Sequence, residues 1–147
     1  KILNNHKKLA EMKKINSNID PALTIAVIET IEGIDKKRCD LTAEEEALQL
    51  SSCVLHKDHV VKAHFHNIQE RNTTKTQESL IVVDGSIKVT LFDIDHKTPI
   101  KKETIEKGGC VILLNGGHEI EILENNTKFY EFKNGPYLGR EKDKTLI

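Results

Sequence analysis

A chain of 147 residues is long enough to bury a hydrophobic core in one domain without disulfides. Its 22 Lys and Arg residues nearly balance its 23 Asp and Glu residues, so the chain has no strong field to attract nucleic acid or an anionic membrane. No apolar stretch has the length of a membrane span. The three cysteines have neither metal-ligand nor redox spacing, and we expect reduced thiols in a cytoplasmic protein.

The N-terminal region, residues 1–47, is expected to form an extension that packs on a domain made by residues 48–147. Its first twenty residues are rich in Lys and Asn and predict a short helical or extended segment. Residues 23–31 are apolar and β-branched, which is typical of a strand. Residues 42–45 have the composition of a capping box and predict one helical turn.

From residue 48 onward, short apolar runs are separated by turn-forming residues every eight to twelve positions. The strongest turn signal, Asp84-Gly85, predicts a hairpin between the runs on either side. Residues 67–76 are polar and without periodicity, which predicts a loop. The predicted strands cover residues 48–55, 60–66, 78–83, 87–92, 110–114, 118–123 and 128–133. The pattern indicates an all-β sandwich or barrel.

Three histidines and a glutamate fall at the ends of these predicted strands. His64 and His66 are separated by one residue, so on an extended strand both side chains point to the same face. Glu78 and His118 each head a row of aliphatic residues, as expected for polar groups at the mouth of an apolar barrel. Converging histidines and a carboxylate predict a first-row metal site. The alternative is a barrel whose histidines are hydrogen-bonded without a metal.

These residues resemble the motifs of the cupins, a family of double-stranded β-helix (jelly-roll) barrels. His64-Phe65-His66 is similar to the His-x-His pair of the first motif, and Glu78 followed after six residues by Gly85 is similar to its second half. Residues 108–118, with a glycine-rich turn before the histidine, are similar to the second motif. The resemblance covers residues 48–133. It implies a cupin barrel that holds one divalent ion (Fe, Mn, Ni or Zn) through His64, His66, Glu78 and His118.

The carboxylate ligand has two candidates, because eleven residues separate His66 from Glu78 and the family usually has three or four. Glu70 lies at the usual spacing but in the polar segment, and no glycine follows it at the family's distance. Glu78 opens a strand, and ligands on strands are held more rigidly than ligands on loops, so we favour Glu78. Glu70 and Arg71 are then candidate substrate contacts near the mouth, or solvated loop charges.

Two further residues are candidate ligand contacts. Lys62 shares the predicted face of the histidine pair and would bind an anionic group, unless its ammonium extends to water at the rim. Tyr137 lies in a Gly-Pro-Tyr tail that is similar to the tail of some small cupins. It would line the mouth or pack the tail onto the barrel.

The resemblance implies a metal-binding cupin that acts on a small molecule, in sugar or polysaccharide metabolism. Isomerisation, epimerisation, decarboxylation and oxygenation all suit such a site. The alternative is a non-catalytic cupin that binds a sugar. Several predicted strands are apolar on both faces, and a sheet of that kind needs cover on both. We therefore expect a homodimer, with no nucleic-acid or membrane partner.

Overall fold

The structure, a computed structural model, describes residues 12–147, and the regular secondary structure in this part of the chain is mostly β, as predicted. The short helix predicted near the N-terminus falls in part on residues 1–11, outside the described residues. The strands are β1 (Lys13–Asn16), β2 (Thr24–Glu29), β3 (Cys39–Asp40), β4 (Ser51–Ser52), β5 (Glu78–Asp84), β6 (Ser86–Phe92), β7 (Pro99–Glu106), β8 (Cys110–Leu113), β9 (Gly117–Ile122) and β10 (Lys128–Lys133); the helical elements are η1 (Ile31–Gly33) and α1 (Arg140–Asp143). None of the helices in residues 12–147 has the length and apolarity to cross a membrane.

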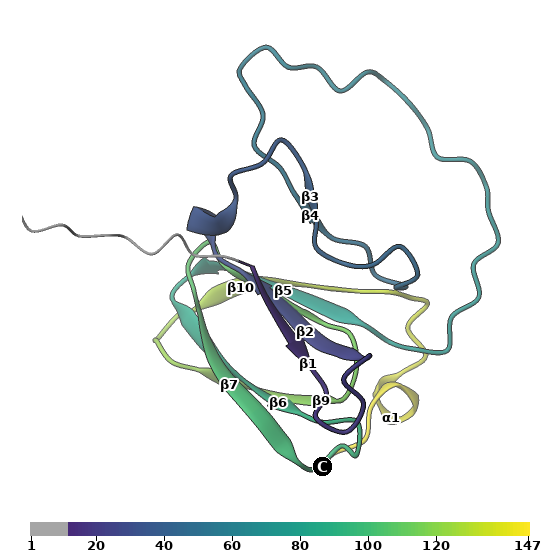
Figure 1. The fold of residues 1–147 in the computed structure, drawn as a ribbon, viewed down its shortest axis with the longest axis vertical. Helices are drawn as coiled ribbons and strands as arrows, with labels where there is room; N and C mark the ends of the chain where they lie inside the picture. The colour runs from purple at the N-terminus through teal and green to yellow at the C-terminus, as the bar shows by residue number, and fades with distance from the viewer. Residues whose placement is uncertain (1–11) are drawn as a thin grey trace, which may run out of the picture.

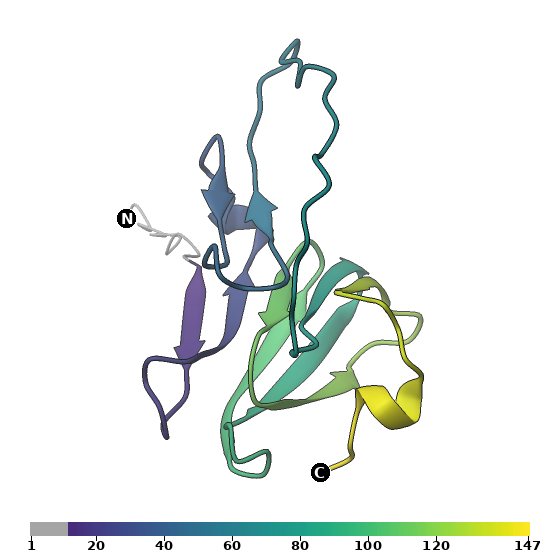
Figure 2. The same cartoon turned by 90° about the vertical axis from the view of Figure 1, so that its right-hand side faces the viewer.

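Two antiparallel sheets pack face to face (Figures 1 and 2). One has five strands in the order β1-β2-β8-β5-β10, and the other has three in the order β7-β6-β9, while β3 and β4 form a separate ribbon. Alternate residues of each strand face inward. β2 is buried on both of its faces, because Leu41, Leu48 and Leu50 cover its outer side. The buried core between the sheets contains Ile25, Ile28, Leu80, Val82, Ile87, Val89, Leu91, Ile105 and Val111.

The predicted hairpin at Asp84-Gly85 is wrong, although the turn itself is present. β5 pairs with β8 and β10, whereas β6 pairs with β7 and β9, so the chain changes sheets at Gly85. Gly85 has φ of +78°, and a Cβ there would lie 2.4 Å from Thr127 Oγ1, so the position requires glycine. A turn signal marks where a chain reverses and does not determine which strands then pair.

The two edges of the sandwich differ. At one edge, Lys13 of β1 and Glu103 of β7 join the sheets through an ion pair of 2.8 Å. At the other edge, β9 pairs with β6 alone and β10 with β5 alone within residues 12–147. Since β1 also pairs with β2 alone and β7 with β6 alone, the described strands form an open sandwich whose two sheets share no backbone pairing at either edge.

The segment of residues 53–77 contains no strand. Strands are predicted at residues 48–55 and 60–66, and of these only β4 (Ser51–Ser52) forms. The segment extends away from the sheets as a long excursion (Figures 1 and 2). Its apolar residues are strongly exposed, including Phe65 at 85% and Ile68 at 100%. β-branched sequence produces a strand only where a neighbouring strand supplies hydrogen bonds, and this segment has no such neighbour among residues 12–147.

The helical turn predicted at residues 42–45 is also not formed. Thr42 Oγ1 accepts a hydrogen bond from Leu50 N at 3.2 Å and not from an N–H of a first helical turn, so it does not act as a helix cap. The N-terminal region contributes directly to the core, because β2 pairs with β8 inside the five-stranded sheet and Ile25 is fully buried.

Candidate functional site

Glu78 and His118 meet at the rim of the sandwich, where the Glu78 side chain is 15% exposed and the His118 side chain 34% exposed. Glu78 is the first residue of β5 and lies in the inward-facing row with Leu80 and Val82. His118, the second residue of β9, lies in the inward row with Ile120. His118 Nε2 lies 2.9 Å from Glu78 Oε2, so strand parity places in contact two side chains that are 40 positions apart in the sequence.

Lys133 completes the polar end of this row. It pairs in register with Glu78, and its Nζ lies 3.5 Å from Glu78 Oε1. Two further carboxylates lie within reach of the same ammonium, Asp143 of α1 at 3.4 Å and Glu131 at 3.5 Å. Three carboxylates thus face one ammonium, and the cluster has an excess of negative charge.

The protonation states in the cluster follow from these contacts. The hydrogen bond from His118 holds the pKa of Glu78 below its usual value, and the charges of His118 and Lys133 act in the same direction against the opposing effect of burial. Burial alone would lower the pKa of Lys133, but the hydrogen bond to Asp143 and the charges of its three carboxylate neighbours raise it. At neutral pH, Glu78 is an ionised acceptor and Lys133 is charged.

Lys133 and Asp143 are site residues that sequence reasoning misses. Lys133 could be assigned to the inward row from the parity of β10, but its position opposite Glu78 depends on the pairing of β5 with β10, which no local signal reports. Asp143 lies in a four-residue helix beyond the last strand. Tyr137, the predicted tail contact, lies beside them, with its ring centroid 5.4 Å from Lys133 Nζ.

The predicted histidine pair lies elsewhere, in the exposed segment of residues 53–77. The rings of His64 and His66 are close to one another, with centroids 5.5 Å apart, and His64 Nδ1 lies 2.8 Å from the carbonyl oxygen of Lys62. The segment extends away from the strands that carry Glu78 and His118 (Figure 1). Within residues 12–147, no three His, Cys, Asp or Glu side chains are grouped as metal ligands.

Glu70 and Arg71 are exposed in the same segment. Glu70 Oε1 accepts a hydrogen bond of 3.4 Å from Asn72, two residues further along the chain. Of the two candidate carboxylates, only Glu78 is held on a strand and in contact with His118.

The preassembled part of the site is therefore a glutamate and a histidine with a lysine beside them. Comparison with models of known protein families, with curated proteins and with solved structures gives no match, so the interpretation of this site rests on its own residues and geometry.

Proposed function

We propose that the chain is a cupin-type jelly roll that binds one divalent metal ion and acts on a small molecule, of the sugar or polysaccharide class. The contact between Glu78 and His118 carries the proposal. It joins the glutamate of the first cupin-like motif to the histidine of the second, at the rim end of two aliphatic rows.

The donor set suits a first-row ion. Imidazole nitrogen and carboxylate oxygen bind such ions at about 2.0–2.2 Å, so two neighbouring ligands at a right angle lie about 3 Å apart. The separation of His118 Nε2 and Glu78 Oε2 is 2.9 Å. The excess of carboxylates around Lys133 also favours a cation at this end of the sandwich. When bound, the ion would supply Lewis-acid or oxygen-activating chemistry.

His64 and His66 are the proposed remaining ligands, supplied by pairing of residues 60–66 with the free edge of β9. Two observations support this step. β9 has an unpaired edge within the described part of the chain, and residues 60–66 leave apolar side chains such as Phe65 in solvent. Pairing would give the edge of β9 the backbone hydrogen bonds that it lacks, and it would bury the apolar side chains of residues 60–66.

This chain's own residues would then divide the work at the site. Before an ion binds, His118 Nε2 and Glu78 Oε2 orient each other through their contact, and the Nε2 proton between them would be replaced by the ion on binding. The hydrogen bond from His118 lowers the pKa of Glu78 most, the charge of Lys133 acts in the same direction, and the Tyr137 ring packs beside the Lys133 ammonium. The aliphatic residues behind them exclude water from the inner end.

Calorimetric titration of the full chain with Mn²⁺ and with Zn²⁺ tests the proposal. We expect one site per chain, weakened at least tenfold by Glu78→Gln and by His118→Ala, and weakened also by His64→Ala and His66→Ala. His59→Ala is the matched control, because it removes an imidazole from the same exposed segment outside the motif.

Three results would contradict the proposal: no saturable binding, equal affinity in Glu78→Gln, or an equal loss in His59→Ala. A greater loss in Glu70→Gln than in Glu78→Gln would transfer the carboxylate role to Glu70. Folded protein that binds a sugar and no metal would favour the non-catalytic alternative.

A further inference from the structure

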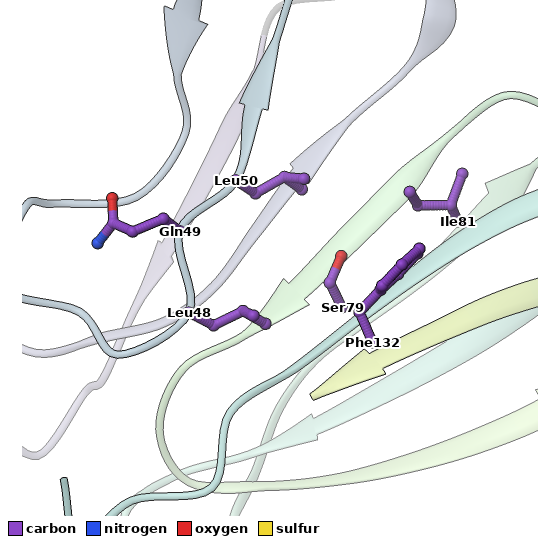
Figure 3. A pocket seen from close by; sticks show the side chains of 6 residues that line it. All are labelled: Leu48, Gln49, Leu50, Ser79, Ile81 and Phe132. Atoms are coloured by element: carbon purple, nitrogen blue, oxygen red, sulfur yellow. The ribbon is translucent and has the colours of Figure 1, made fainter. Parts of the chain in front are cut away.

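A second site lies on the outer face of the five-stranded sheet. Residues 48–50 pack over β2 and β8, and a pocket of about 150 Å³ lies between them and the outward side chains of β5 and β10 (Figure 3). Ser79 and Ile81 have the opposite parity to Glu78, so this pocket and the Glu78–His118 pair lie on opposite faces of the sheet. The lining residues are Leu48, Gln49, Leu50, Ser79, Ile81 and Phe132.

The wall of this pocket is fixed by hydrogen bonds at both ends. Leu48 N donates to Oε1 of Gln77, a side chain that is only 1% exposed, at 2.9 Å. Two residues later, the carbonyl oxygen of Leu50 accepts from Leu41 N at 2.8 Å, and Leu50 N donates to Thr42 Oγ1 at 3.2 Å. The wall therefore cannot close onto the sheet without breaking these bonds.

The interior of the pocket is apolar apart from one hydroxyl. Gln49 turns its amide away and donates to the carbonyl oxygens of Ala43 and Glu46, at 2.9 and 2.7 Å. Ser79 is 2% exposed, and its Oγ has no hydrogen-bond partner among residues 12–147. Buried hydroxyls almost always have a partner, and leaving one unpaired is unfavourable. An unpaired hydroxyl on the floor of an apolar pocket indicates a ligand that supplies the missing partner.

We propose that this pocket binds a simple phenol, meaning one six-membered aromatic ring that bears a single hydroxyl. A cavity of roughly 150 Å³ lined by apolar side chains is large enough for benzene, and this pocket has that volume and a lining of Leu, Ile and Phe. Phe132 offers a ring to pack against, and aromatic pairs gain from that contact beyond their burial. The ligand hydroxyl pairs with Ser79 Oγ.

The test compares phenol with benzene by NMR titration of the full chain. The wild-type chain is expected to bind phenol about threefold to tenfold more tightly than benzene, the effect of one hydrogen bond. Ser79→Ala removes that preference and keeps benzene binding; this variant deletes an unpaired hydroxyl and is expected to fold. Ser79→Leu fills the pocket and abolishes binding of both. Ser86→Ala is the control, because the Ser86 hydroxyl is bonded to Glu124 at 2.6 Å and does not line this pocket.

Each contrary result overturns a stated part of the proposal. Equal affinity for phenol and benzene in the wild type, or a preference that survives Ser79→Ala, would remove the role of the hydroxyl. The proposed site would be contradicted by an absence of saturable binding, or by chemical-shift changes that do not include Ile81 and Phe132. Phenol binding that requires Phe65→Ala would show that the exposed segment occupies the pocket with its own ring.

Discussion

Gln77 is the residue whose replacement tests the packing of residues 48–50 most sharply. It is buried immediately before β5, and its side chain accepts from Leu48 N at 2.9 Å and donates to the carbonyl oxygen of Leu114 at 3.2 Å and to Glu46 Oε2 at 2.5 Å. Gln77→Leu keeps most of the volume and removes all three bonds. A buried group left without its partner costs about 1–3 kcal/mol. Because Leu114 is buried and Leu48 half-buried, we expect a loss of about 2–4 kcal/mol in the free energy of unfolding.

Urea unfolding of the wild-type chain, Gln77→Leu and Gln49→Leu measures this loss. Gln49 is the matched control, since its amide also makes hydrogen bonds to carbonyl oxygens but is exposed, and water replaces those bonds. We expect Gln49→Leu to cost less than about 1 kcal/mol, as for most surface substitutions. The role of Gln77 in holding residues 48–50 in place would be refuted if the free energy of unfolding of Gln77→Leu lay within about 0.5 kcal/mol of the wild-type value. It would also be refuted if Gln77→Leu were no more destabilised than Gln49→Leu.

Four further outcomes are expected. Folding lowers the pKa of Glu78, so the ionised carboxylate stabilises the fold; this stabilisation is complete above the usual pKa of 4.5 and is lost as pH falls through the lower folded pKa. In urea unfolding across this acidic range, the free energy of unfolding of Glu78→Gln should therefore depend less on pH than that of the wild type. Burial raises the pKa of the Cys110 thiol to about 11, so iodoacetamide should modify the exposed Cys53 first and leave Cys110 unmodified in the folded chain. Modification of both cysteines at the same rate would contradict the burial of Cys110. Lys133→Met should strengthen divalent-metal binding about threefold to tenfold in the same titration, because it removes a partly exposed positive charge 3.5 Å from Glu78; unchanged affinity would place the ion elsewhere. Sedimentation at micromolar concentration should show a homodimer, and a monomer alone would contradict that expectation.

Strand parity is what makes the contact between Glu78 and His118 predictable. Each residue heads an aliphatic row in the sequence, and rows that face one core bring their polar ends to the same rim. The position of Lys133 could not be predicted in the same way. It depends on which strand pairs with β5, and that choice is made by long-range packing and not by local sequence.

The segment of residues 53–77 shows the same limit more strongly. The sequence between Val60 and His66 has the composition of a strand, yet a strand forms only with a neighbour, and none lies beside it. The turn at Asp84-Gly85 is correctly located from its residues, but β5 and β6 then join different sheets. Local sequence determines where this chain extends and where it turns, and tertiary packing determines which extended segments pair.

Elemental analysis of the purified wild-type chain and of His118→Ala is the most direct test of the metal site. The proposal predicts close to one divalent first-row ion per chain in the wild type and loss of that ion in a folded His118→Ala variant. A wild-type chain that holds no such ion after exposure to Mn²⁺, Fe²⁺, Ni²⁺ and Zn²⁺, or a His118→Ala chain that holds as much as the wild type, would contradict it.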